Sequence, residues 1–78
     1  MIEFKDLTTY WLDKDTFVFY FKGGNDGDND TYSYLCEYHA DEDKFVFEKW
    51  YEYDTTDSGF TDEQKEYIMG KMKECMSA

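Results

Sequence analysis

The sequence predicts an α+β fold: a four-stranded antiparallel β-meander, made of two hairpins, with one C-terminal α-helix packed on one face. The pattern Tyr-x-x-Asp-x-Asp-x-Phe-Val-Phe occurs twice, at 10–19 and at 38–47. Aromatic residues, which are enriched in β-strands, make up 22% of the chain. The C-terminal segment carries helix-start signals and a methionine stripe at helical spacing. With 78 residues, the chain is expected to be a single domain, 1–78.

Each copy of the repeat predicts one hairpin. Residues 16–22 and 44–53 are rich in β-branched and aromatic residues, which is typical of strands. Each follows an Asp-rich turn, and the strand-like runs at 6–12 and 31–39 precede the two turns. Aspartate favours such turns because its side chain bonds to the local backbone.

A short helix over 3–11 is an alternative to the first strand. Phe4, Leu7 and Trp11 fit the spacing of one helical face. The repeat and the Thr-Thr-Tyr-Trp run favour a strand instead.

The remaining segments predict two loops and the helix. Glycine, asparagine and aspartate at 23–30 indicate a loop between the hairpins, and 54–59 indicates another loop before the helix. Thr61 followed by Gln64 three residues later is a capping-box pattern. The stripe expected to face the core consists of Ile68, Met69, Met72 and Met76.

The faces of the sheet depend on the first turn. If Lys14–Asp15 is a two-residue loop, Leu12 pairs with Phe17 and Tyr10 with Phe19. One face then holds Phe17, Phe19, Phe21, Phe45, Phe47, Tyr51 and Tyr53. The other holds Trp11, Val18, Leu35, Val46 and Trp50, mixed with Glu37, Glu48 and Glu52. A three-residue loop would shift the first strand by one residue and move Trp11 to the other face. One helix covers one face only, so the uncovered face is a candidate interface.

Charge is the strongest functional signal. Nineteen acidic residues face eight lysines, and the net charge is −11. Such a surface repels nucleic acid and anionic membranes and attracts basic proteins or cations. No stretch approaches the roughly 20 apolar residues of a membrane span, and the N-terminus lacks a signal-peptide pattern. We therefore expect a cytoplasmic protein in which Cys36 and Cys75 are reduced thiols.

A meander places alternate turns at the same end of the sheet, so the two acidic turns are expected to lie together. The predicted partner-binding residues are Asp13, Asp15, Asp41, Glu42 and Asp43, with Trp11 or Trp50 as an apolar anchor. A concentrated negative edge of this kind suits docking onto a surface rich in lysine and arginine.

Metal and catalytic motifs are weak by comparison. Residues 26–37 place Asp26, Asp28, Asp30 and Glu37 as in a calcium loop, but Thr31 occupies the position that requires glycine. Cys36 and His39 would point to opposite faces of a strand, which argues against a zinc site or a Cys–His nucleophile. No catalytic signature is present, so we expect no metal, no cofactor and no enzymatic activity.

As a class, a small acidic domain of this kind resembles the DNA-mimicking inhibitors encoded by phages and mobile elements, including anti-CRISPR and anti-restriction proteins. The resemblance implies an inhibitor whose carboxylates occupy the basic channel of a nucleic-acid-handling effector, without binding nucleic acid itself. The alternative is a homo-oligomeric interaction module, in which the uncovered aromatic face of the sheet forms a homodimer.

Overall fold

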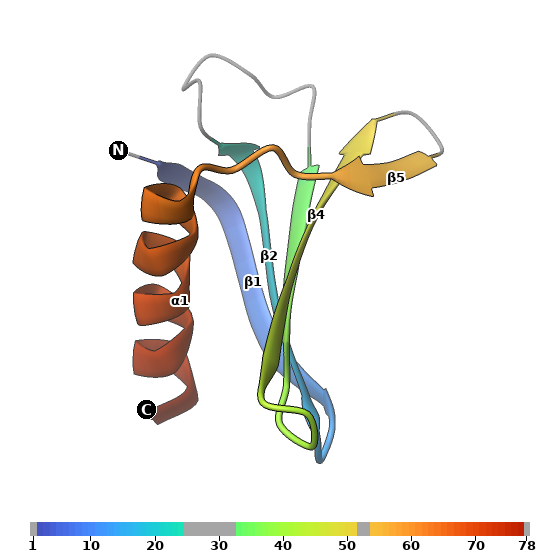
Figure 1. Ribbon diagram of the computed structural model, residues 1–78, viewed down its shortest axis with the longest axis vertical. Coiled ribbons are helices and arrows are strands. Elements are labelled where there is room, and N and C mark those ends of the chain that lie inside the picture. Colours follow the sequence, from blue (N-terminus) through green and yellow to red (C-terminus); the bar gives the residue numbers. More distant parts are fainter. Residues whose placement is uncertain (1, 25–32, 52–53, 78) are drawn as a thin grey trace.

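The computed structural model describes residues 2–24, 33–51 and 54–77, which form one antiparallel sheet and one helix (Figure 1). The strands are β1 (Glu3–Asp13), β2 (Thr16–Gly24), β3 (Ser33–His39), β4 (Lys44–Tyr51) and β5 (Asp54–Asp57), and the helix is α1 (Asp62–Ser77). The strand order β1-β2-β3-β4-β5 is that of a meander. The predicted fold class is confirmed, and β1 rules out the alternative helix over 3–11.

The prediction of a loop over 54–59 is wrong for its first four residues, which form β5. Lys49 pairs with Thr56 and Trp50 pairs with Thr55, so β5 adds a fifth strand along the outer side of β4. The two aspartates of this segment indicate a turn, but the β-branched threonines between them suit a short edge strand.

The first hairpin differs in register from the simple two-residue prediction. Asp13 pairs with Thr16, so Lys14 and Asp15 do form a two-residue turn. The next pair is Trp11 with Phe17, which leaves Leu12 as an extra residue in a β-bulge. The expected pairings of Leu12 and Tyr10 are therefore wrong. The bulge shifts the first strand by one residue, as a three-residue loop would have done.

Trp11 consequently lies on the same face as Phe17, the face that α1 covers, and not with Val18. The two rings are 5.3 Å apart between centroids. A second irregularity places Asp6 and Leu7 opposite Phe21 alone, with Asp6 at a φ of 51°. β1 is thus an edge strand interrupted by two bulges.

The core forms between the sheet and α1. Among the described residues, its buried members are Ile2, Phe17, Phe19, Phe21, Tyr34, Cys36, Phe60, Ile68 and Met72. Phe45 and Phe47 pack against this cluster from β4, as predicted for the shared phenylalanine face. The predictions for Tyr51, Glu52 and Tyr53 concern side chains outside the described part of the chain.

The helix begins as the capping-box pattern predicts. Gln64 N–H donates to Thr61 Oγ1 at 3.1 Å, and Thr61 N–H donates to Gln64 Oε1 at 2.8 Å. Ile68 and Met72 are fully buried and Met76 packs against the core, so three residues of the predicted stripe face the sheet, while the half-buried Met69 does not belong to this cluster. Because α1 is the only helix among the described residues, the other face of the sheet has no helix over it; we call it the open face.

Candidate functional site

The two acidic turns lie together at one end of the sheet, at the bottom of Figure 1. Ala40 N–H in the second turn donates to the carbonyl oxygen of Asp15 in the first turn, at 2.7 Å. This backbone hydrogen bond fixes the spacing of the turns. We call the resulting surface the acidic tip, and it consists of Asp13, Asp15, Asp41, Glu42 and Asp43.

Two of these carboxylates stabilise their own turns. Asp13 Oδ1 accepts a hydrogen bond from the backbone N–H of Asp15 at 2.8 Å, and this bond lowers the pKa of Asp13. Asp43 has a φ of 50°, a conformation that aspartate tolerates better than most residues. Its Oδ1 accepts a hydrogen bond from Tyr38 Oη at 2.8 Å, which raises the pKa of the Tyr38 phenol.

Asp41 and Glu42 project from the second turn and are exposed. One carboxylate oxygen of each lies within 4.8 Å of the other and of a ring nitrogen of His39. His39 Nε2 is also 3.0 Å from Glu37 Oε1. The second turn thus brings acidic side chains close together, and Lys14 and Lys44 flank the tip.

Sequence reasoning did not assign His39 to the tip. His39 could have been assigned to the tip from its place at the end of a predicted strand, directly before the second turn; in the structure it pairs with Thr16 of β2. Cys36 points to the other face, where it is buried between Phe19 and Phe47 in register. Cys36 and His39 therefore lie on opposite faces of β3, as their spacing in a strand predicts.

Of the two candidate anchors, only Trp11 lies beside the acidic tip. It is separated from Asp13 by the bulged Leu12, and its side chain is 47% exposed. Trp50 pairs with Ser33 and Thr55 at the opposite end of the sheet. At about 3.3 Å per strand residue, Trp50 is roughly 20 Å from the second turn. Of the calcium-like segment 26–37, residues 26–32 lie outside the described residues and 33–37 belong to β3.

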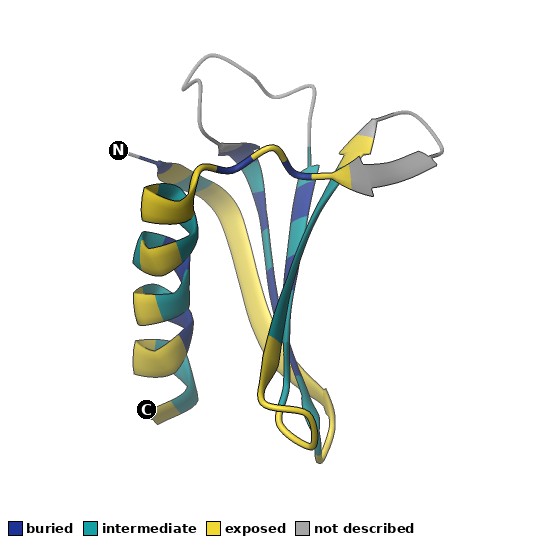
Figure 2. Ribbon diagram, viewed as in Figure 1, coloured by how far each residue is buried: buried dark blue, intermediate teal, exposed yellow. Residues whose placement is uncertain are grey.

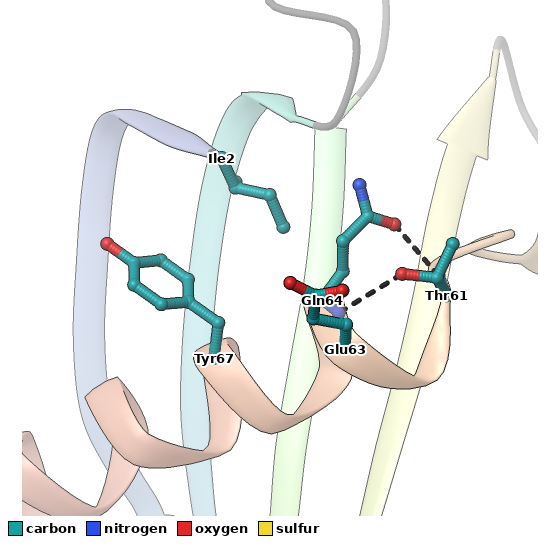
Figure 3. Close-up of a pocket in the computed structure, with 5 residues that line it drawn as sticks. All are labelled: Ile2, Thr61, Glu63, Gln64 and Tyr67. Carbon is teal, nitrogen blue, oxygen red and sulfur yellow. Dashed lines mark hydrogen bonds between the residues drawn. The ribbon is translucent and has the colours of Figure 1, made fainter.

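A separate shallow pocket lies where α1 begins, and Ile2, Thr61, Glu63, Gln64 and Tyr67 line it (Figure 3). The side-chain oxygens of Thr61 and Gln64 are already engaged in the helix cap. The pocket therefore keeps the Glu63 carboxylate, the Gln64 amide nitrogen and the Tyr67 hydroxyl as its other polar groups.

No protein-family model matches the chain, and no characterised protein or solved structure is significantly similar to it. Within the described part of the chain, α1 is neither long nor apolar enough to cross a membrane.

Proposed function

We propose that this protein is a binding protein that docks its acidic tip onto a basic, nucleic-acid-binding surface of a partner protein and blocks that surface. The observation that carries the proposal is the joining of the two acidic turns by the Ala40–Asp15 hydrogen bond. Five carboxylates lie on two neighbouring turns, whose strands hold them in place. Because the strands fix the backbone of both turns, less conformational entropy is lost on binding than for carboxylates on a free loop.

The proposed partner is a nucleic-acid-handling effector, and the proposed location is the cytoplasm. Carboxylates gathered at one end of a sheet compete with phosphates for the same lysine and arginine side chains. Trp11 supplies apolar surface beside the tip, and its exposed ring would add contact area to the charge contacts. The function is inhibitory in this account, because an occupied groove cannot hold nucleic acid.

A charge-neutral variant of the tip tests the proposal. The triple substitution Asp15→Asn, Asp41→Asn and Glu42→Gln removes three charges but keeps the turn hydrogen bonds of Asp13 and Asp43. The matched control is Glu3→Gln, Glu66→Gln and Glu74→Gln, three exposed positions away from the tip. Both variants have the same net charge, so a difference between them reports position and not total charge.

The wild type and the control should capture the same proteins from cell extracts, and the tip variant should lose them. The captured proteins should bind DNA or RNA, and the wild type should displace a labelled oligonucleotide from them. Each desolvated charge contact is worth about 1 kcal/mol or more, so the tip variant should bind at least tenfold more weakly. Equal losses in both variants, or captured proteins that bind no nucleic acid, would refute the proposal.

A further inference from the structure

Most of the exposed large apolar residues among the described residues belong to one edge strand, although the register places Tyr10 and Trp50 on the open face. Within the described part of the chain, the large exposed hydrophobic residues are Leu7, Tyr10, Trp11, Leu12 and Trp50. All but Trp50 belong to β1, where every residue except Phe4 is exposed, as Figure 2 shows along the strand. The open face, by contrast, has Glu37 between Val18 and Val46.

The outer side of β1 pairs with no other strand among the described residues, because β1 ends the strand order. An edge strand presents a row of unpaired backbone groups, and exposed apolar side chains make such an edge a template for another strand. The sequence of β1 decides which strand fits best.

We propose that β1 pairs antiparallel with β1 of a second copy of this chain, about a two-fold axis at Thr9. In this register Thr9 lies opposite Thr9 of the second copy, and Leu7 lies opposite Trp11. Each of these cross-strand pairs occurs twice in the dimer, as the symmetry of an isologous interface requires. Leu7 and Trp11 thereby cover each other, and Thr8 lies opposite Tyr10.

Charge complementarity favours the same register. Lys5 lies opposite Asp13 of the second copy, so opposite charges meet at both ends of the paired segment. Moving the axis to Thr8 sets Lys5 opposite Trp11, and moving it to Tyr10 sets Leu7 opposite Asp13. The two bulges flank the regular segment Thr8–Trp11, so the ladder between the copies is short and the dimer is expected to be weak.

This proposal rests on the edge strand, and it shares Trp11 and Asp13 with the proposed binding of a partner at the acidic tip. An antiparallel pairing at Thr9 directs the two tips to opposite ends, roughly 40 Å apart at about 3.3 Å per residue. That distance exceeds the screening length of about 8 Å at physiological salt. Each copy carries a net charge of −11, so repulsion opposes the dimer and added salt should strengthen it. Added salt should instead weaken the binding of a basic partner to the tip, so the salt dependence of the two interactions has opposite signs.

Sedimentation equilibrium with Thr9→Lys is the direct test. Thr9 is exposed, so the variant should fold, which a thermal melt followed by circular dichroism would verify. In the proposed dimer two ammonium groups would meet on the axis, and dimerisation should weaken by about tenfold or more. The matched control is Trp50→Lys, which makes the same charge change at an exposed residue of β4 and should leave the dimer intact.

The wild type should dimerise more tightly at high salt than at low salt, and the backbone amides of 7–11 should exchange more slowly as concentration rises. A wild type that stays monomeric at millimolar concentration in high salt would overturn the proposal. So would a dimer that survives Thr9→Lys but is lost in Trp50→Lys. At high salt, where charge repulsion is screened, the tip triple variant should dimerise like the wild type, so the tests of the two proposals can fail separately.

Discussion

The two cysteines show how burial controls the chemistry of single residues. Cys36 is fully buried between sheet and helix, and this burial raises the pKa of its thiol to about 12. Cys75 is half-buried on α1, and both thiols are free in the structure. A thiolate is the reactive form of cysteine, so the two residues should differ sharply in reactivity.

We therefore expect iodoacetamide to alkylate Cys75 in the native protein and to spare Cys36. Cys36 should react only as fast as the protein unfolds. Intact-mass analysis and peptide mapping over time would show one adduct first, and the variant Cys75→Ser should gain none under native conditions. Equal labelling of both residues would mean that Cys36 is not in the core.

The hydrogen bond between Tyr38 and Asp43 predicts a specific pH dependence. The bond and the negative charge of Asp43 favour the neutral phenol, so the pKa of Tyr38 is raised above its ordinary value of 10.0. A group whose pKa rises on folding stabilises the folded state below its unfolded pKa. That stabilisation is lost as the pH rises through the folded pKa, here above about 10.

Urea unfolding of wild type and Tyr38→Phe measures this effect. The difference between their midpoints should be constant below about pH 9 and should shrink as the pH passes 10 and rises further. A nuclear magnetic resonance titration of the Tyr38 ring should give a lower pKa in Asp43→Asn than in the wild type. A difference between midpoints that does not change with pH would show that the bond is absent in solution.

At the scale of elements, two glycines have opposite roles. Gly70 lies inside α1, and a Cβ added there would meet no atom within 4 Å. Gly59 joins β5 to α1 with a φ of 76°, which other residues adopt only with strain. Its N–H donates to Asp57 Oδ1 at 2.8 Å, so this conformation is part of an ordered turn.

Gly70→Ala should stabilise the protein by about 1 kcal/mol, because alanine is the better helix former and there is space for its methyl group. Gly59→Ala should destabilise it by about 1 kcal/mol or more, because alanine is strained at positive φ. Urea denaturation of the two variants provides the comparison, and each serves as the control for the other. Destabilisation by both would indicate that the helix packs more tightly at Gly70 than the structure shows.

The elements were largely predictable from local sequence, and their registers were not. The capping box at Thr61 and the alternating phenylalanines each specify one local structure, and each was predicted correctly. The repeat suggested two equivalent hairpins, yet Leu12 bulges out of the first while the second closes with a four-residue turn between His39 and Lys44. Bulges depend on packing across strands, here Trp11 against Phe17, which no local pattern encodes.

The same distinction holds for the candidate site. The meander topology placed the two turns at one end, so the residues of the acidic tip could be grouped from sequence alone. The face of Trp11 stayed open between the two loop lengths considered, because its position depends on the bulge at Leu12. Trp50 was also predicted as an anchor, because the sequence alone did not show how far it lies along β4 from the turns.

At the scale of the whole molecule, the net charge of −11 is shared by surfaces with different geometry. On α1, acids such as Glu66 and Glu74 are spread along an exposed surface with lysines between them, and Glu74 lies 3.7 Å from Lys71. At the tip, the carboxylates of Asp41 and Glu42 converge to within 4.8 Å of each other, on one of two turns that a backbone hydrogen bond joins. The central claim is that this convergence, and not the total charge, selects a basic partner.

A nuclear magnetic resonance titration with a short polyarginine peptide tests that claim most directly. The peptide presents guanidinium groups without any other specific feature, so amide shifts report where basic groups prefer to bind. Our account predicts that the largest shifts occur at 13–16 and 40–44, that added salt reduces them, and that the tip triple variant loses them while the matched control keeps them. Shifts of equal size over the acids of α1 and of the tip would contradict the account, because the acidic tip would then be one part of a uniformly charged surface.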